Sequence, residues 1–413
     1  MHYDSLSNSI NTKIKRLDHP DPRFLRYTSP HPTSSLDLTP ILSSPRTRIT
    51  TLPNGLRVAT QSTPWDKTAT VGVWVDAGSR FETDETNGVA HFLEHMILNG
   101  TKSRSGKALW EEVENMGGYL NAYTSREQTT YYVKVMEKEV PMALDILADM
   151  LQNSCMDEAL IDQERVGAVR HEDIVEQVKK LFTKLSANPN TSLQWVANQP
   201  TIFTGSEVRI IDDDAPLAQF AIAFEGASYT DPDSIALMVM QTVLSSWDKT
   251  SGAGKQMGSE LAQKVSINEL AESMAAFSTN YSDTGLFGVY AVAKPDCLED
   301  LSQAIMYQIT KLIYRVSEVD VIRARNQLKS SMLLHLDGTT PVAEDIGRQL
   351  LKYGRRIPLT ELMARIDAVD VDTVKHVANR FIFDKDMAIA AMGPIQGLQD
   401  YNWFRRRTYW LRY

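Results

Sequence analysis

The pattern of apolar and polar residues in the first half of the chain is repeated in the second half. The apolar run at residues 69–79, which ends in a small-residue turn, corresponds to the run at 217–228. Residues 129–135 correspond in the same way to residues 286–292. Short apolar runs bounded by turn residues are typical of buried strands. The repetition therefore predicts two similar halves on one chain.

A helix is predicted after the second strand of each half, because apolar residues recur there at spacings of three and four. These residues are Ala143, Leu144, Leu147 and Leu151 in the first half and Leu301, Ile305, Ile309 and Leu312 in the second. Another helix is predicted around residues 163–165 and, in the second half, around 323–325. This order of elements predicts an α+β fold with two tandem homologous domains.

The two halves differ in length after this last helix. In the second half, 67 residues separate Arg325 from Gly393, which closes a strand. In the first half, only Val166 lies between Arg165 and Gly167. By the logic of the repeat, about 66 residues are missing from the first half at 165–167. A gap of this size removes several helices and strands and exceeds ordinary variation in loop length.

Domain limits follow from the repeat and from local composition. Residues 1–46 are rich in Ser, Pro, Asp and Thr, which predicts an extended N-terminal arm. The first, truncated domain is predicted at 47–187, a linker at 188–205, and the second domain at 206–413. Near the start of the first domain, Pro53-Asn54-Gly55 predicts a hairpin turn.

Composition excludes several classes of protein. The net charge of −9 argues against a nucleic-acid surface and is compatible with a basic partner or substrate. The apolar runs are far shorter than the roughly 18–20 residues that cross a bilayer.

Cys155 and Cys297 lie far apart, so they predict neither a disulfide framework nor a thiolate metal site. The first residues show no secretory or transit signal, so no targeting peptide is expected in the chain.

His91-Phe-Leu-Glu94-His95 is an H-x-x-E-H pattern inside a stretch that predicts a helix. On a helix, His91 and His95 share one face, and Glu94 lies on the same side. Two imidazoles can then bind one zinc ion, which also needs a third protein ligand and a position for water. Glu94 is the candidate general base for that water. Taken alone, the pattern also fits a histidine pair that is hydrogen-bonded to neighbouring carbonyls.

The sequence around this motif resembles that of the pitrilysin-type zinc metallopeptidases. Their motif is called inverted because its order is the reverse of the H-E-x-x-H motif of other zinc peptidases. Residues 47–165 and 167–413 are similar to the beta subunits of mitochondrial processing peptidases, and these in turn to core subunits of the respiratory bc1 complex. The segments that carry the resemblance are 51–59, 77–82, 91–96, 114–118, 120–128, 147–154 and 403–410. The resemblance implies two pitrilysin-type domains, each with an antiparallel-rich sheet packed with helices, and an inactive second domain.

The resemblance also implies roles for individual residues. His91 and His95 match two zinc ligands, and Glu94 matches the catalytic base. Glu164 matches an acidic residue that supports the site, although an exposed helix carboxylate is an equal alternative. An edge strand matches the one on which an extended presequence docks by main-chain pairing. Its residues are Asn121, Ala122, Tyr123, Thr124 and Ser125.

The chain departs from this family at the third zinc ligand. The family has a glutamate there, seven residues after the position of Glu164, whereas this chain has His171 in a segment that matches the end of the domain. His171 and Glu172 have the right chemistry to replace it and are weak surrogates. Two histidines alone bind zinc weakly. The resemblance therefore implies a peptidase by family, and leaves the activity of this chain open.

The function that the resemblance implies is a mitochondrial zinc metalloendopeptidase that removes N-terminal presequences from imported precursors. Its cofactor is one zinc ion, and its partners are a homologous alpha subunit and basic presequence peptides. Its location is the mitochondrial matrix or the matrix face of the inner membrane. The alternative is a non-catalytic core subunit, bound to other subunits of the bc1 complex, or an inactive truncated isoform.

Overall fold

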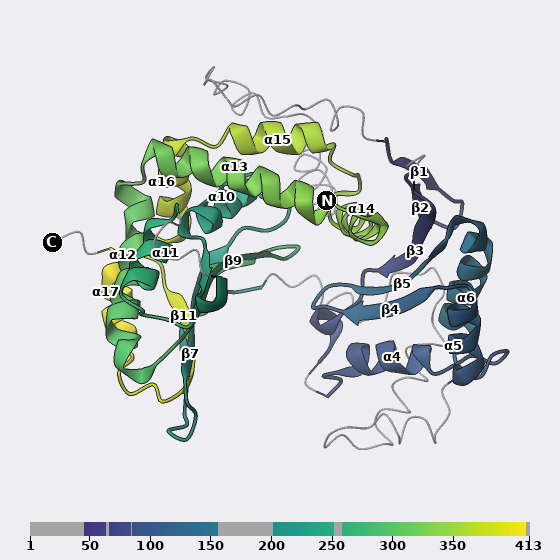
Figure 1. The fold of residues 1–413 in the computed structure, drawn as a ribbon, viewed down its shortest axis with the longest axis horizontal. Helices are drawn as coiled ribbons and strands as arrows, with labels where there is room; N and C mark the ends of the chain where they lie inside the picture. Colours follow the sequence, from purple (N-terminus) through teal and green to yellow (C-terminus); the bar gives the residue numbers. More distant parts are fainter. Residues whose placement is uncertain (1–44, 63–65, 84, 156–200, 252–257, 410–413) are drawn as a thin grey trace, which may run out of the picture. The chain divides into compact units, whose positions relative to one another are not determined.

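A computed structural model describes residues 45–62, 66–83, 85–155, 201–251 and 258–409 (Figure 1). The described residues form two compact units. The N-terminal unit takes its residues from Ser43–Pro200 and His335–Arg356, and the C-terminal unit from Thr201–Leu334 and Ile357–Tyr413. No described helix is long and apolar enough to cross a membrane.

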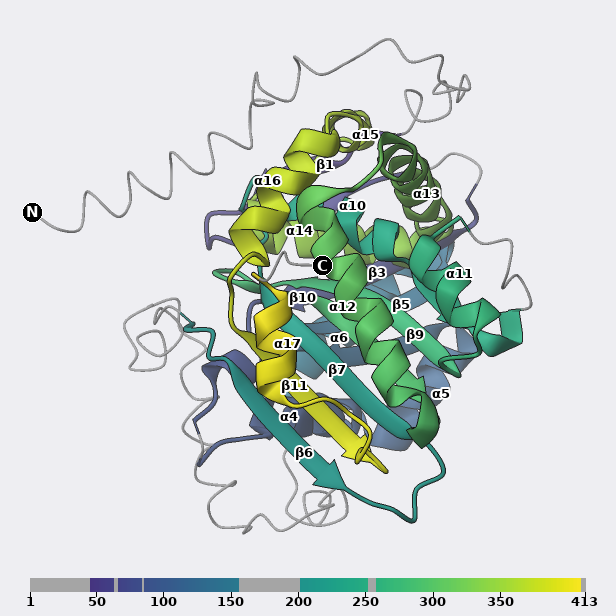
Figure 2. The ribbon, with the colours of Figure 1, turned by 90° about the vertical axis from the view of Figure 1, so that its left-hand side faces the viewer.

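The C-terminal unit contains a six-stranded sheet. Its strands are β6 (Ser206–Ile211), β7 (Ala218–Gly226), β8 (Ser246–Asp248), β9 (Ser273–Asn280), β10 (Gly285–Ala293) and β11 (Met387–Gly393). Their order in the sheet is β6-β11-β7-β10-β9-β8, and Figure 2 shows β6, β11 and β7 side by side. Strand β11 is parallel to β6 and antiparallel to β7. The other pairs are antiparallel, so the sheet is antiparallel-rich as predicted.

Helices cover one face of this sheet because every second strand residue is apolar and buried. Along β7, Phe220, Ile222 and Phe224 are buried, and the residues between them are half-buried. The described helices of this unit are α10 (Ser234–Leu244), α11 (Glu260–Ile267), α12 (Leu298–Tyr314), α13 (Glu318–His335), α15 (Leu359–Asp367), α16 (Val371–Phe381) and α17 (Tyr401–Arg407). Of these, α10, α11 and α16 contact the strands, whereas α15 packs on α10 and α17 packs on α12. All four apolar residues predicted for the buried face of α12 belong to this core.

The N-terminal unit contains a three-stranded antiparallel sheet and a separate hairpin. The sheet has the order β3 (Thr68–Val75), β5 (Thr129–Met136), β4 (Tyr119–Thr124). The hairpin pairs β1 (Arg48–Thr51) with β2 (Arg57–Thr60), and Gly55 in its turn has a φ of 86°. A positive φ is easily reached by glycine, which explains the Pro-Asn-Gly turn expected here.

In the part of this unit that the structure describes, the sheet is accompanied by α4 (Val89–Leu98), α5 (Gly106–Asn115) and α6 (Val140–Asn153). The core contains Leu109 and Val113 of α5, Val133 of β5, and Ile146 and Leu147 of α6. Leu144, which the apolar spacing placed on the buried face of α6, is 51% exposed. The spacing identified the correct helix but overestimated the width of its buried face, because only a narrow face of α6 meets the sheet.

Another described helix of the N-terminal unit comes from far along the sequence. Helix α14 (Thr339–Tyr353) follows α13 in the chain but packs on β3. The contact is close, because a Cβ atom built on Gly347 would lie 2.2 Å from Cδ2 of Trp74. Repulsion at such a distance requires a glycine there. The predicted second domain, 206–413, includes this helix, whereas the contacts of the described residues place it in the N-terminal unit.

The internal repeat is visible in the strand orders of the two units. The order β3-β5-β4 matches β7-β10-β9. The sequence had paired β3 with β7 and β5 with β10, and the structure adds the match of β4 with β9. Among the described residues, the N-terminal unit has no strand that corresponds to β11. In the second half, β11 lies inside the stretch whose counterpart the repeat predicts to be missing from the first half.

Candidate metal and catalytic site

Helix α4 carries the H-x-x-E-H residues, and a carboxylate stabilises its first turn. The backbone N–H of Gly88 donates to Oε2 of Glu82 at 2.9 Å, and that of Ala90 donates to Oε1 at 2.7 Å. A carboxylate at this end satisfies free amide groups and interacts favourably with the helix dipole. The same glutamate therefore sets where the helix of the site begins.

His91 and His95 lie on the same face of α4. Their Nε2 atoms are 3.4 Å apart, and their ring centroids are 4.8 Å apart with the planes at 78°. Both side chains are exposed. Neutral imidazole nitrogens this close, on a solvent-accessible face, are suited to share one metal ion.

Glu94 lies beside the histidines but is buried, with 8% of its surface exposed. Its Oε2 has no hydrogen-bond partner among the described residues. Burial raises the pKa of the nearby Tyr131 phenol well above its ordinary value, and the carboxylate of Glu94 raises it further. A buried carboxylate oxygen without a partner costs free energy, and a catalytic role is one of the explanations for such a group in a folded protein.

Sequence reasoning did not single out Tyr131. It lies within the strand predicted at 129–135, where an aromatic residue is typical of a packed core. No motif surrounds it. Its relevance to the site comes from its position near Glu94, which spacing in the sequence does not reveal.

Strand β4 forms an edge of the three-stranded sheet, and α4 packs against it. Among the described residues, β4 pairs only with β5. The backbone N–H of Ala122 donates to Oδ1 of the Asn121 side chain at 2.9 Å. Two further hydrogen bonds hold the strand's side chains, from Asn121 to Tyr132 and from Gln128 to Tyr123. A strand edge next to the histidine pair can accept an extended peptide.

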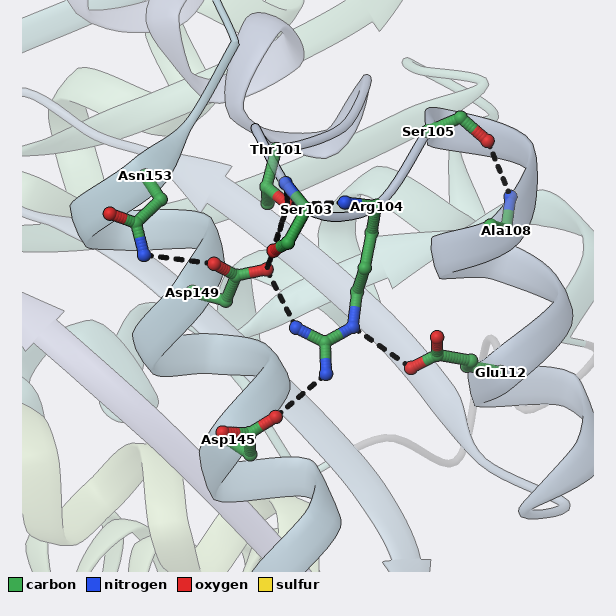
Figure 3. Close-up of polar contacts among 9 residues, drawn as sticks. All are labelled: Thr101, Ser103, Arg104, Ser105, Ala108, Glu112, Asp145, Asp149 and Asn153. Carbon is green, nitrogen blue, oxygen red and sulfur yellow. Dashed lines mark hydrogen bonds and ion pairs between the residues drawn. The ribbon is translucent and has the colours of Figure 1, made fainter.

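The loop after α4 is fixed by an arginine with three carboxylate partners (Figure 3). Arg104 donates to Asp149 at 2.6 Å, to Asp145 at 2.7 Å and to Glu112 at 3.0 Å. Glu112 lies on α5, and the two aspartates lie on α6. Arginine is suited to such a site because its planar guanidinium has several donors in fixed directions. This network holds the C-terminal end of α4 against its two neighbouring helices.

Asp149 is the acceptor at the centre of this network (Figure 3). Ser103, Thr101, Asn153 and Arg104 all donate to it, and together they outweigh burial and hold the pKa of its carboxyl well below the usual range. Such a carboxyl stabilises the fold above its unfolded pKa of about 3.9. The contribution is lost as the pH falls below that value toward the folded pKa.

Replacing Asp149 with asparagine is expected to lower the free energy of unfolding by about 2 kcal/mol at pH 7, since hydrogen bonds to charged groups contribute about 1.5–3 kcal/mol. Urea unfolding of both proteins at pH 7 and at pH 3 measures this. The difference in free energy of unfolding between the two proteins should be smaller at pH 3, because there the stabilisation by the ionised Asp149 begins to be lost. Asp145→Asn is the control, since that carboxylate is 68% exposed. Equal differences at both pH values would contradict a depressed pKa.

The remaining candidate residues, Glu164, His171 and Glu172, lie outside the described residues. Within the described ranges, no group of three or more His, Cys, Asp and Glu residues is placed to hold a metal ion. The described part of the site therefore fits zinc in part: His91 and His95 are two suitable donors, and a peptidase zinc needs a third protein ligand.

Two family sequence models match the chain. The model described as "Insulinase (Peptidase family M16)" matches residues 57–192, and "Peptidase M16 inactive domain" matches residues 166–328. Together they cover more than half of the chain. The chain therefore belongs to peptidase family M16.

Among curated relatives, the chain is 60% identical to the probable mitochondrial-processing peptidase subunit beta of Arabidopsis thaliana, over 100% of this chain and 90% of that protein. It is 40% identical to the mitochondrial-processing peptidase subunit beta of Bos taurus, over 90% and 89%. A chain of "Complex III2 from Candida albicans, Inz-5 bound" has the same fold, with a TM-score of 0.71 and 22% identity over 88% of this chain and 100% of that one.

The alignment with the Arabidopsis protein bears on the missing segment. It extends over 481 positions, which exceeds the 413 residues of this chain by 68. At least that many aligned positions therefore have no residue here. The number is close to the shortfall of about 66 residues that the internal repeat predicts.

Proposed function

We propose that this chain is the beta-type subunit of a mitochondrial presequence-processing peptidase. The observation that carries the proposal is the geometry of α4. Two histidine Nε2 atoms lie 3.4 Å apart, next to a buried glutamate whose Oε2 has no described partner. The names of the relatives support the substrate class, since both are mitochondrial-processing peptidase beta subunits.

His91 and His95 are the residues that would hold zinc. When bound, zinc supplies a Lewis acid for the scissile carbonyl and lowers the pKa of the attacking water. Glu94 accepts the proton of that water and later donates it to the leaving amine. Its burial beside a neutral tyrosine strengthens the interactions that it makes with developing charge, because the local dielectric constant is low.

The edge of β4 is the proposed binding site of the substrate. A presequence in extended form would add to this edge by main-chain hydrogen bonds, which tolerate many side chains. The net charge of −9 favours the approach of basic peptides. The proposed partner is a homologous alpha subunit, and the proposed location is the mitochondrial matrix or the matrix face of the inner membrane.

The test is to purify the chain together with an alpha subunit, then measure its zinc content and its cleavage of a presequence peptide. About one equivalent of zinc and a single cut are expected. His91→Ala should lose both, whereas His335→Ala, on α13, should lose neither. His171→Ala and Glu172→Ala identify the surrogate third donor by which of them lowers the zinc content. Native protein with neither zinc nor cleavage would reject the catalytic form of the proposal.

A second candidate is a non-catalytic core subunit of the bc1 complex, or an inactive truncated isoform. The observation that favours it is the number of zinc donors: the described residues provide two, and at least 68 aligned positions of the Arabidopsis relative have no residue here. Co-purification with cytochromes in the absence of cleavage would support the core subunit.

A further inference from the structure

The C-terminal unit shows how a complete sheet is built in this repeat. Strand β11 lies between β6 and β7, parallel to the first and antiparallel to the second. It pairs with β7 from Gln219 to Phe224. Strand β6 ends at Ile211 and β7 begins at Ala218, so the two strands follow one another in the chain. In the sheet, however, β11 lies between them.

Among the described residues, the N-terminal unit has the two outer strands of this arrangement, and no inserted strand lies between them. Strand β2 ends at Thr60 and β3 begins at Thr68, a connection similar to that between β6 and β7. Within the described residues, β2 pairs only with β1, and β3 pairs only with β5. We call the edge of β3 that faces away from β5 the open edge.

Helix α14 holds both strands although they do not pair with each other. At the first turn of α14, Thr339 and Thr340 lie 2.9 Å and 3.1 Å from the hydroxyl of Thr70 on β3. Near the last turn, the carbonyl of Leu350 accepts a hydrogen bond of 2.7 Å from Arg57 on β2. The same helix thus positions β3 and the β1–β2 hairpin within one unit.

The composition of β3 is unusual for an edge strand. Its residues, Thr-Ala-Thr-Val-Gly-Val-Trp-Val, include neither a charge nor a proline. Natural edge strands are commonly protected by charges, prolines or bulges, because unpaired backbone groups accept other strands. When the turn at 76–79 is aligned with the turn at 225–228, residues 70–75 of β3 correspond to residues 219–224 of β7. These are the residues of β7 that pair with β11.

From these observations we propose that the open edge of β3 binds an extended segment of another polypeptide, antiparallel to β3 and in the place that β11 takes in the C-terminal unit. The ligand class follows from β11. The ligand is a run of about six uncharged residues in which alternate positions are apolar. In β11 these positions are Met387, Ile389 and Ala391, which are buried, whereas the residues between them are more exposed. This edge lies on the opposite side of the sheet from β4, and the inference does not depend on the proposed peptidase function.

The test uses the purified full chain and a synthetic peptide with the sequence of residues 386–394, which contains β11. A fluorescent label reports binding by anisotropy, and a benzophenone at the position of Ala388 reports the site by photo-crosslinking and mass spectrometry. Saturable one-to-one binding is expected, with crosslinks to residues 68–75. A peptide with Ile389→Lys should bind at least about tenfold more weakly, because it places a charge in the buried row.

A peptide with N-methyl groups on three alternate residues tests the main-chain pairing. Each lost hydrogen bond costs about 0.5–1.5 kcal/mol, so about a tenfold or greater loss of affinity is expected. Equal affinity of the methylated peptide would overturn the proposal, as would crosslinks confined to β4 or β6. A dimer of the chain that the peptide dissociates would assign the edge to a second copy of this chain and would also overturn the proposal.

Discussion

Replacing Glu94 with glutamine is expected to lower presequence cleavage by at least about a hundredfold, which is the usual contribution of a general base. Glutamine keeps the shape of the side chain but cannot accept the proton of the attacking water. The zinc content should not change, because Glu94 is not one of the proposed ligands. Steady-state cleavage by the purified complex, together with metal analysis of the same sample, measures both effects.

The burial of Glu94 adds a second readout to this experiment. Its Oε2 is buried without a described partner, so removing the charge should leave the stability of the fold unchanged or raise it. Glu114→Gln is the matched control, since Glu114 is an exposed glutamate on α5. Full cleavage by the Glu94→Gln protein would show that another group serves as the base.

Replacing Glu127 with alanine is expected to destabilise the N-terminal unit by about 3–5 kcal/mol, because it removes one partner from a buried ion pair. The two carboxylate oxygens of Glu127 accept hydrogen bonds from Arg80 and from Lys352, each at 2.7 Å. The side chains of Glu127 and Lys352 are 5% and 6% exposed. Without the carboxylate, Arg80 and Lys352 lose the buried acceptor that they share, and Asp76, which lies 3.7 Å from Lys352, is 61% exposed and compensates less.

Hydrogen exchange measures this effect locally, which matters because the chain has two units and its unfolding need not be two-state. Amides of β5 and α14 should both exchange faster, since Lys352 lies on α14. Glu111→Ala is the control: Glu111 is 59% exposed and forms a pair of 3.5 Å with Lys107. Such surface pairs contribute about 0–1 kcal/mol. Faster exchange in β5 alone would show that this ion pair does not hold α14.

Local patterns in the sequence predicted β3 and β5 of the N-terminal unit, β7 and β10 of the C-terminal unit, and the helix of the candidate site, but not β6, β8 or β9. Apolar residues that recur every two residues indicate a strand, and those that recur every three to four indicate a helix. Each such pattern concerns a single element. They correctly identified α12 and its buried residues, but at Leu144 they extended the buried face of α6 too far. The width of a buried face depends on what packs against it, which the local pattern does not contain.

Contacts between distant residues could not be predicted in this way. The ion pair between Glu127 and Lys352 joins residues 225 positions apart. The packing of Gly347 on Trp74 depends on a helix that the sequence assigns to the other half. Similarly, Tyr131 becomes part of the site only through its position near Glu94. The roles of Glu164, His171 and Glu172 stay predictions.

The origin of α14 has a consequence for synthesis of the protein. The last described residue before the chain leaves the N-terminal unit is Cys155, and α14 ends at Tyr353. At about 5–20 residues per second, the ribosome takes roughly 10–40 s to make the residues between them. During that time β3 and the β1–β2 hairpin lack the helix that fixes them. The first half of this protein therefore completes its folding only after most of the second half has been translated.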